Sequence, residues 1–465
     1  MGEQIVSRGL NDSREERHET ERVRDPIHGM IEYNDAEQAI INSPAMQRLR
    51  GIKQLALTEY VYPGAKHSRF EHSLGTMHVA GRIANKPEMG LQEKEIQIIR
   101  LAALLHDVGH GPFSHVAEEC LEKYSKLGKD QSRQEIHEKI TADIIRMDPV
   151  VVTAIKNTKI DPEEVAAVIS HGTDRTFATD IVSGPVDADK LDYLLRDSYY
   201  AGVKYGVYDL ERIIGEAKII GNKENLAFAE GAMWALEQLL LARHHMFTQV
   251  YQHRIRLISD AMIVRGLTLA AEEDSDIKHL FEYNGSKEFL ASWQALDDEA
   301  MFRRIAACSC TQAKAIFDDL KHRRLYKRIA RVDLAKDITN IKQKARLVKM
   351  DAKDQMALEK KIAEALGLDD WKVIASVTNT NKPGFRRARI EVGPSTIFIV
   401  DRNGEPVEFG GHPDALAIFP EYREILEVYV PVVGDTAEER KAFRAQAEAA
   451  AWSIIKEYGK KVGAK

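Results

Sequence analysis

The sequence predicts a mainly α-helical protein that ends in a smaller α+β lobe. Three observations support this fold class. Apolar residues recur at helical spacing from about residue 35 to residue 273, strand-like segments are almost absent over that stretch, and short β-branched segments separated by turn residues appear in the last hundred residues. With 465 residues, 44% of them hydrophobic, the chain is long enough for two or three domains with a sizeable core.

The helical part is expected to follow a short polar tail. Residues 1–22 are charged and predict a flexible N-terminal tail. Helical spacing begins at Asp35 and continues to about Leu55, with a break at Ser43-Pro44 that indicates two short helices. Further helices are predicted at 68–85, 93–107, 114–126, 134–147, 149–157, 162–170, 187–200, 208–219 and 230–273. We therefore expect one helical domain over residues 23–345.

Residues 346–465 are expected to form the α+β lobe, with a role in oligomerisation or regulation. Helical spacing covers 313–364, and this segment is unusually basic. Strands are predicted at 371–377, 387–392, 396–400 and 425–432, followed by a final helix at 436–458.

The composition argues against several classes of protein. Three Cys, at positions 120, 308 and 310, are too few for a disulfide framework and indicate a reducing compartment. No apolar run reaches the roughly 18–20 residues that cross a bilayer, and the polar start of the chain lacks the apolar segment of a secretory signal. We therefore expect a cytoplasmic protein without membrane contact. The formal charge of −6 gives no general nucleic-acid signature.

The strongest local signal for function is the segment Leu104-Leu-His-Asp-Val-Gly-His-Gly-Pro-Phe-Ser-His115. Glycines and a proline end a helix at His106 and Asp107, so both side chains can turn toward one ion. Imidazole nitrogen and carboxylate oxygen suit a divalent cation. His72 upstream and Asp189 downstream, each on a helix of its own, complete a candidate set of four metal ligands.

The order His…His-Asp…Asp is similar to that of the HD-domain phosphohydrolases, and longer motifs extend the resemblance. These motifs are Arg24-Asp-Pro-Ile-His-Gly29, Gln47-Arg-Leu-Arg-Gly-Ile-Lys-Gln-Leu55, Tyr62-Pro-Gly-Ala-Lys-His-Ser-Arg-Phe-Glu-His-Ser-Leu-Gly75, the segment from His106 to His115, Asp189-Lys-Leu-Asp-Tyr193 and Tyr251-Gln-His253. They resemble the vertebrate sterile-alpha-motif/HD-domain dNTP triphosphohydrolases and bacterial dGTPase-like relatives, from about residue 23 into the C-terminal lobe. Only some 22 residues precede the first motif, so no sterile-alpha-motif domain is expected.

The resemblance implies a helical HD-domain catalytic body and metal-dependent hydrolysis of deoxynucleoside triphosphates. Water would attack the α-phosphorus and release deoxynucleoside and inorganic triphosphate. This reaction needs activated water, neutralisation of phosphate charge and a proton for the departing 5′-oxygen. The implied cofactor is one divalent metal ion, and a donor set of two His and two Asp accepts Mn, Fe, Mg, Zn or Ni.

The candidate catalytic residues are His110, His115, Glu118 and His137. His115 and Glu118 are three residues apart, so they share a helix face, and a carboxylate behind a His fixes its tautomer. By resemblance, His115 is the general acid at the 5′-oxygen, while His110 and His137 contact phosphate. The vertebrate enzyme has Asp in place of Glu118.

The resemblance also implies the substrate contacts. Cationic side chains bind the triphosphate, aromatic rings wall the sugar and exclude a ribose 2′-hydroxyl, and polar side chains hold the 3′-hydroxyl. The cationic residues are Arg69, Lys190 and Arg243, and the aromatic residues are Tyr193 and Tyr251. The polar residues are Gln54 and Asp197, and Leu55 is a further candidate contact. A four-residue step from Asp189 through Tyr193 to Asp197 places these three side chains on one helix face. Phe247 departs from the vertebrate pattern, which has His there.

Regulation is the point at which this sequence departs most from the vertebrate pattern. Family members generally work as oligomers, often tetramers, with nucleotides bound between subunits, so the resemblance implies a homo-oligomer and a nucleotide effector. The corresponding effector residues are Asn42, Gln47 and Arg50. Asn42 replaces an Asp that accepts hydrogen bonds from guanine, and its amide places a donor against a donor. We therefore predict that GTP is a poor activator.

Three other functions stay open alongside dNTP hydrolysis. The first is a nucleotide-binding sensor without catalysis, which the intact ligand and His sets disfavour. The second is an HD-type nuclease or nucleic-acid-binding protein, supported by the basic stretch 321–349, although a solvated helix face or a subunit interface is the preferred interpretation of that stretch. The third is an HD phosphohydrolase that acts on another nucleotide, such as a ribonucleotide or an alarmone.

Overall fold

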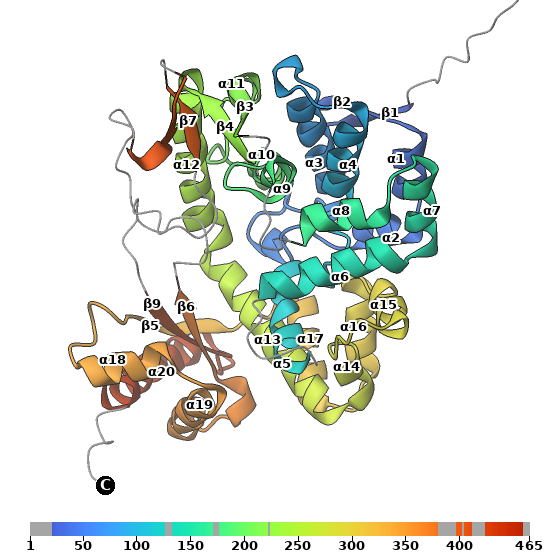
Figure 1. The fold of residues 1–465 in the computed structure, drawn as a ribbon. Coiled ribbons are helices and arrows are strands. Elements are labelled where there is room, and N and C mark those ends of the chain that lie inside the picture. Colours follow the sequence, from blue (N-terminus) through green and yellow to red (C-terminus); the bar gives the residue numbers. More distant parts are fainter. Residues whose placement is uncertain are drawn as a thin grey trace, which may run out of the picture.

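The computed structural model of the protein describes residues 21–125, 133–170, 176–221, 224–379, 397–401, 404–411 and 424–458. Helices dominate these residues, and a smaller part with strands lies toward the C-terminus (Figure 1), which confirms the predicted fold class. The helices are α1 (Asp35–Ile41), α2 (Pro44–Arg48), α3 (Arg69–Ala84), α4 (Glu93–Leu105), α5 (Glu118–Tyr124), α6 (Arg133–Met147), α7 (Pro149–Asn157), α8 (Pro162–Ile169), α9 (Phe177–Ser183), α10 (Ala188–Ala201), α11 (Leu210–Glu216), α12 (Met233–Met246), α13 (Arg254–Glu273), α14 (Ser275–His279), α15 (Lys287–Gln294), α16 (Asp298–Ala307), α17 (Thr311–Lys321), α18 (Ile341–Val348), α19 (Ala352–Leu366) and α20 (Ala437–Glu457).

Within the described part of the chain, the strands form three small sheets. They are β1 (Glu21–Asp25), β2 (Gly29–Tyr33), β3 (Ala217–Ile220), β4 (Asn225–Ala229), β5 (Lys327–Asp333), β6 (Ile374–Asn379), β7 (Phe398–Val400), β8 (Pro406–Glu408) and β9 (Glu424–Val430). β1 pairs with β2, the second sheet has the order β3-β4-β7-β8, and the third has the order β5-β9-β6. Every pairing is antiparallel except that of β4 with β7.

Helix α3 begins at a capping box, in which Ser68 accepts from the backbone of the first turn and Glu71 accepts from the backbone of Ser68. This cap fixes the first turn of α3, which carries Arg69 and His72. Helix α3 packs against both α4 and α10. The three helices that carry the expected metal ligands therefore meet inside one continuous apolar core.

Two β-hairpins accompany the helices of the expected helical domain, one before residue 35 and one within the stretch where strands were expected to be almost absent. Residues 21–33 form the β1–β2 hairpin, so Glu21 and Arg22 belong to a strand; the rest of the expected tail lies outside the described residues. The helix expected at 208–219 ends at Glu216 and gives way to the β3–β4 hairpin. β4 pairs with β7, more than 160 residues later in the chain, and local spacing cannot reveal such a partner.

The helix expected at 230–273 is not continuous. Helix α12 ends at Met246, a π-helical turn covers Phe247–Tyr251, and α13 begins at Arg254. The Nδ1 atom of His253 accepts a hydrogen bond from the backbone of Ile255 and so caps α13. The turn displaces Tyr251 from the regular four-residue step that a continuous helix would give from Arg243 through Phe247 to Tyr251.

The C-terminal lobe has a core of its own. The expected helical segment 313–364 is interrupted by β5, which pairs with β9 in the third sheet, and α19 and α20 pack on that sheet. β5 lies before residue 346, the expected start of this lobe, so its inward residues, such as Val332, belong to the second core. An ion pair of 2.5 Å joins Arg265 of α13 to Glu359 of α19. The strand expected at 387–392 lies outside the described residues.

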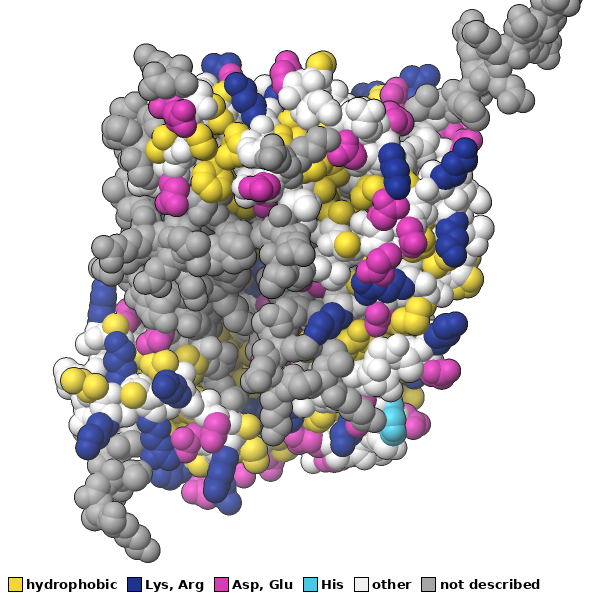
Figure 2. All heavy atoms as spheres, in the orientation of Figure 1, with side chains coloured by type: hydrophobic (Ala, Val, Ile, Leu, Met, Phe, Trp, Pro, Cys, Tyr) yellow, Lys and Arg dark blue, Asp and Glu magenta, His cyan; other side chains and the backbone are white. Residues whose placement is uncertain are grey.

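Several arginines of the basic stretch are paired with acidic side chains. Arg324 contacts Asp318 and Asp319, and Arg346 contacts Asp354. On the face seen in Figure 2, basic and acidic side chains lie interspersed over the described residues. No helix among the described residues combines the length and the apolar character needed to cross a membrane.

Candidate metal centre and its surroundings

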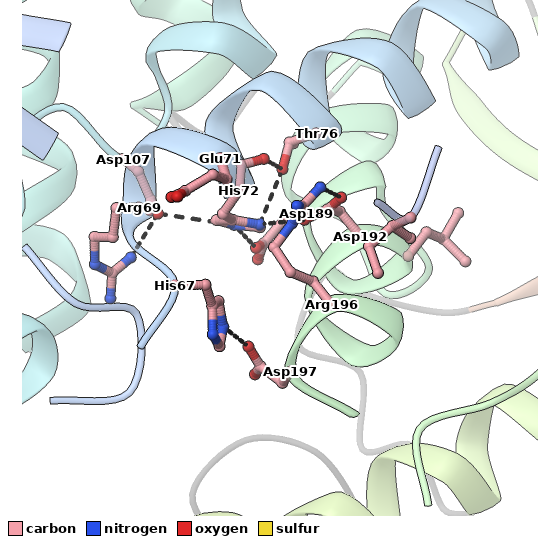
Figure 3. Close-up of polar contacts among 12 residues, drawn as sticks. His67, Arg69, Glu71, His72, Thr76, Asp107, Asp189, Asp192, Arg196 and Asp197 are labelled. Atoms are coloured by element: carbon pink, nitrogen blue, oxygen red, sulfur yellow. Dashed lines mark hydrogen bonds and ion pairs between the residues drawn. The ribbon is translucent and has the colours of Figure 1, made fainter. Parts of the chain in front are cut away.

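The four expected metal ligands come together between α3, the end of α4 and the first turn of α10, and Figure 3 labels three of them, His72, Asp107 and Asp189. The Nε2 atom of His72 lies 3.0 Å from Oδ1 of Asp189 and 3.2 Å from Nε2 of His106. The Nε2 atom of His106 lies 3.3 Å from Oδ1 of Asp107, and Nε2 of His72 lies 3.7 Å from Oδ2 of Asp107. His72, His106 and Asp189 therefore present donor atoms within 4.8 Å of one another, and Asp107 lies beside both imidazoles. Imidazole nitrogen and carboxylate oxygen are the donors that suit a divalent ion.

Both candidate His ligands are held by their second nitrogen. The Nδ1 atom of His72 lies 2.7 Å from Oδ2 of Asp192, and Nδ1 of His106 lies 2.8 Å from the carbonyl oxygen of Ala103. A proton on Nδ1 satisfies these acceptors and leaves the lone pair of Nε2 directed at the shared volume. Such outer partners fix the tautomer and the orientation of ligating histidines, so this donor set fits a metal ion.

Asp192 is the centre of a buried network behind His72. It accepts from Nε and Nη2 of Arg196, each at 2.8 Å, and lies 2.6 Å from Nε2 of His28. Arg196 also donates to Asp25 at 2.8 Å. The motif at residues 24–29 thus reaches the candidate metal centre from the β1–β2 hairpin.

Charge within the ligand set is strongly coupled. Burial disfavours a charged imidazole, but hydrogen bonds with Asp189 and Asp192 outweigh burial and raise the pKa of His72 to about 10. Burial opposes the carboxylate of Asp107 as well, yet Arg69 and the neighbouring imidazoles hold its pKa well below the usual range. The carboxylates therefore stay charged, as ligands for a cation must.

The four candidate catalytic residues form a second cluster around Glu118. The Oε1 atom of Glu118 lies 2.8 Å from Nδ1 of His110 and 3.2 Å from Nδ1 of both His115 and His137. The rings of His110 and His137 stack with centroids 4.2 Å apart. Burial opposes the charge of Glu118, but His115 and His137 hold its pKa well below the usual range. Burial, Arg69 and His137 lower the pKa of His110 to about 4.

Asp107 connects the two clusters. Its Oδ1 atom lies 3.2 Å from Nε2 of His110, and its Oδ2 atom accepts from Arg69 at 2.5 Å. Arg69 also donates through Nε to the hydroxyl of Ser114 at 2.7 Å, while its Nη2 atom is buried without a hydrogen-bond partner. Arg69 therefore has one donor available beside the candidate metal ligands.

The loop after α4 has its shape because two glycines let other groups approach closely. A Cβ atom on Gly109 would lie 2.5 Å from the carbonyl oxygen of His137, and one on Gly111 would lie 2.2 Å from the ring of Trp293. Trp293 is buried and donates from its indole nitrogen to the carbonyl of Gly109 at 2.9 Å. The ring of Trp293 thus supports the segment that joins the two clusters.

The residues expected to hold the sugar also meet. The hydroxyl of Tyr251 donates to Oδ2 of Asp197 at 2.6 Å, and the ring of Tyr251 lies 6.3 Å from that of Tyr193. The ring of Tyr193 in turn lies 6.4 Å from that of His72. Sequence analysis missed His67, whose Nε2 atom lies 2.7 Å from Oδ1 of Asp197. The signal was its place two residues before Arg69 within a recognised motif.

Gln54 and Leu55 lie on the segment that is hydrogen bonded to the backbone of His67. The backbone of Gln54 donates to the carbonyl of His67 at 3.0 Å, and its side-chain Oε1 atom is buried without a hydrogen-bond partner. Leu55 is buried in the apolar core.

Other expected substrate and effector residues have partners within the protein. Lys190 contacts the carboxylate of Asp187 and donates to the carbonyl of Gly184 at 2.9 Å. Arg243 lies close enough to Tyr193 to lower its pKa, although burial is the larger effect and raises it.

The three effector candidates lie near one another on α1, α2 and the turn that follows. Asn42 is the C-cap of α1, and Gln47 donates to the carbonyl of Ile41 at 2.8 Å. Arg50 donates to Gln47 at 2.8 Å and places its guanidinium 3.6 Å from the centre of the Phe70 ring. These contacts hold Arg50 over the first turn of α3.

Comparison with known proteins defines the class of protein. The HD domain family matches residues 69–197, which include the four candidate ligands, and the HD associated region matches residues 208–399. An uncharacterized protein of Methanocaldococcus jannaschii is 34% identical over 351 residues, which cover 75% of this chain and 67% of that protein. The chain belongs to the HD domain family.

Some relatives have named activities. The deoxynucleoside triphosphate triphosphohydrolase SAMHD1 homolog of Dictyostelium discoideum is 31% identical over 332 residues, covering 68% of this chain and 61% of that protein. SAMHD1 of Bos taurus is 30% identical over 271 residues, covering 52% of this chain and 46% of that protein. The chain thus spans about half to two thirds of these relatives. A phosphohydrolase from Bacteroides thetaiotaomicron shares the fold, with a TM-score of 0.66 over 89% of this chain and all of that chain, at 22% identity.

Proposed function

We propose that the protein hydrolyses deoxynucleoside triphosphates to deoxynucleoside and inorganic triphosphate with the help of one divalent metal ion. One observation carries the proposal: a continuous series of rings runs from the ligand His72 through Tyr193 to Tyr251, whose hydroxyl holds Asp197. Aromatic and polar side chains that could bind a sugar therefore lie next to the candidate ligand His72, and the His–Glu118 cluster lies next to the candidate ligand Asp107. Relatives named as dNTP triphosphohydrolases support the same reaction.

His72, His106, Asp107 and Asp189 would hold the metal ion. When bound, a divalent ion supplies a lowered pKa for water and positive charge beside the α-phosphate. Arg69 adds a second positive charge, because its partnerless Nη2 atom is a donor suited to a phosphate oxygen. Lys190 is the amine that would have to exchange its contact with Asp187 for a phosphate group.

His115 is the proposed proton donor to the departing 5′-oxygen. Its side chain is 62% exposed, so a substrate can reach it, whereas Glu118 behind it is buried. Glu118 lies 3.2 Å from Nδ1 and favours a proton there, which leaves Nε2 as the atom that faces a substrate. In the protonated ring, Nε2–H donates to the leaving oxygen while Nδ1–H stays on Glu118.

Sugar selection is assigned to Asp197 and Tyr251. Asp197 accepts from the Tyr251 hydroxyl and lies beside Nε2 of His67, and a carboxylate has further acceptor positions for a 3′-hydroxyl. The ring of Tyr251 would meet a 2′-hydroxyl, so a ribonucleotide could not enter without displacing it. Gln54 has a buried oxygen that lacks a partner and is a second candidate for the 3′-hydroxyl.

The test is incubation of the purified protein with each dNTP and each rNTP under several divalent metals, with chromatography of the products. We expect deoxynucleoside and triphosphate, and, in heavy-oxygen water, label in the triphosphate. The double variant His106→Ala/Asp107→Ala should lose the metal ion that the four candidate ligands would hold, together with hydrolysis. Orthophosphate or pyrophosphate as the first product, or equal cleavage of ATP and dATP, would contradict the proposal and favour another nucleotide substrate.

A further inference from the structure

The cluster around Glu118 has the composition and spacing of a metal site in its own right. Three imidazole nitrogens, all of them Nδ1, surround one carboxylate oxygen at 2.8 to 3.2 Å. They come from three segments: His110 from the loop after α4, His115 from the 3-10 turn η4 (Ser114–Val116), and His137 from α6. Four donor atoms of these residues lie within 4.8 Å of one another.

Hydrogen bonding leaves part of this cluster unsatisfied. His110 and His137 are 2% and 9% exposed, and their Nδ1 atoms have no hydrogen-bond partner although both lie near Glu118. A buried polar atom without a partner costs free energy, and an ion coordinated by both lone pairs would remove that cost.

The geometry points to a second divalent-metal site, formed by His110, His115, Glu118 and His137, which takes a zinc-like transition-metal ion. A tetrahedral ion with bonds of about 2.0–2.2 Å keeps its ligands roughly 3.3–3.5 Å apart, so the three distances from Glu118 to the imidazoles need to lengthen by only a few tenths of an ångström. Three imidazoles and one carboxylate are ligands that Zn²⁺ and Co²⁺ accept readily. The exposed ring of His115 gives the ion a route from solvent.

The second site is connected to the first through one imidazole. His110 would bind the ion through Nδ1, so its proton must reside on Nε2, which lies 3.2 Å from Oδ1 of Asp107. A filled second site thus turns His110 into a donor that orients a ligand of the first site. If the proposed function is correct, an ion in the second site coordinates His115, the proposed proton donor, and therefore lowers the turnover of dNTPs.

Metal content tests the site without reference to hydrolysis. The protein is freed of metal with a chelator, loaded with Zn²⁺ or Co²⁺, passed through gel filtration and measured by elemental analysis. We expect about two ions per chain in the wild type. His106→Ala, which leaves Asp107 beside His110, should retain about one ion and show the visible absorption of tetrahedral Co²⁺. His115→Ala/His137→Ala should also retain about one ion.

The single variant His115→Ala guards against loss of folding, because this side chain is mostly exposed and packs little. It should weaken the second Zn²⁺ equivalent by about tenfold or more, while His279→Ala, which removes an imidazole that is 70% exposed on α14, should keep both equivalents. One ion in the wild type, or two ions at unchanged affinity in His115→Ala, would overturn the second site. If the wild type binds two ions but does not hydrolyse dNTPs, the proposed function is contradicted and the second site is not.

Discussion

Asp192 does not belong to the candidate ligand set, yet it holds the position of His72 by accepting from Nδ1 while Arg196 neutralises its charge. Asp192→Asn keeps the shape and removes the charge, so His72 loses the partner that fixes its orientation. We expect metal affinity to fall about 10- to 100-fold, measured by competition with a chelator. Asp209→Asn, at the exposed N-cap of α11, is the matched control and should leave metal affinity unchanged. Equal affinity in both variants would argue that Asp192 has no part in ligand orientation.

Tyr251 contributes a ring and a hydroxyl, and two substitutions separate them. Tyr251→Ala removes the ring, so turnover of rNTPs should rise relative to dNTPs, by about tenfold or more if the ring excludes the 2′-hydroxyl. Tyr251→Phe keeps the ring and loses only the bond to Asp197. It should still reject rNTPs, while its KM for dNTPs rises. If Tyr251→Ala leaves the ratio of rNTP to dNTP turnover unchanged, the ring of Tyr251 does not exclude ribonucleotides.

His78 makes the stability of the fold depend on pH. Burial, with the positive charges of His28, Arg82 and Arg100 nearby, lowers the pKa of His78 to about 4. The unfolded chain takes up this proton near pH 6.5 and the folded chain does not, so stability falls as the pH falls from about 6.5 to about 4. His78→Asn should therefore lose less stability than the wild type between pH 7.5 and pH 5.0 in urea unfolding. The exposed His279→Asn should behave like the wild type; an equal acid loss in all three proteins would contradict this assignment.

The individual ligands could be predicted from sequence because a His-Asp pair at a helix end, with a His and an Asp on other helices, has a chemical meaning by itself. The residues that hydrogen bond to the site residues and hold them in place could not be predicted from sequence. The contact of Asp192 with His72 and that of His67 with Asp197 join residues more than 100 positions apart, and they depend on how α3 and α10 pack. Glu118 was expected behind His115 alone, whereas it also lies beside His110 and His137.

At the level of elements, the loop after α4 is the most constrained segment of the candidate site. Gly111→Ala would place a methyl group 2.2 Å from the ring of Trp293. We expect a loss of about 1–3 kcal/mol in the free energy of unfolding, together with weaker metal binding, because Asp107 and His110 lie on the same loop. Gly215→Ala in α11 meets open space and should stabilise slightly. Urea unfolding of both variants measures the difference, and equal stabilities would contradict the close contact.

Helices were easier to predict than strands. Segments such as 149–157 and 162–170 are confirmed almost to the residue by α7 and α8, because an apolar helix face and an N-terminal proline are both local signals. β5 lies in a run of alternating basic and apolar residues that also fits a helix, and its partner β9 comes about 90 residues later. The break between α12 and α13 escaped prediction because no proline or glycine marks it.

For the whole molecule, the prediction concerns control by a second nucleotide, and it rests on the proposed function. Asn42 presents one acceptor and one donor where the N1–H and N2–H₂ groups of guanine are both donors. A polar group left unpaired and buried by the bound nucleotide costs about 1–3 kcal/mol, or roughly tenfold to a hundredfold in affinity. Turnover of each dNTP should therefore change little on addition of GTP. Asn42→Asp should raise GTP affinity by a similar factor. Strict dependence on GTP that is lost in Asn42→Ala would show that the amide does not have this effect.

The oligomeric state and the division at residue 346 stay predictions. A homo-oligomer, with a tetramer favoured, is expected from the resemblance, and light scattering at working concentration measures it. The mixed charges on the face in Figure 2 and the paired arginines of the basic stretch agree with the preference for nucleotide over nucleic-acid partners, which a salt-dependence measurement of DNA binding can check.

The sheet β3-β4-β7-β8 makes the C-terminal third inseparable from the rest. A chain that stopped at residue 345 would keep the β3–β4 hairpin but lose β7, the parallel neighbour of β4. The central residues of β4 are buried, so the truncated protein would expose an apolar strand edge, a template on which other chains aggregate. During synthesis, the β3–β4 hairpin therefore cannot gain its parallel neighbour until β7, more than 160 residues later in the chain, has left the ribosome.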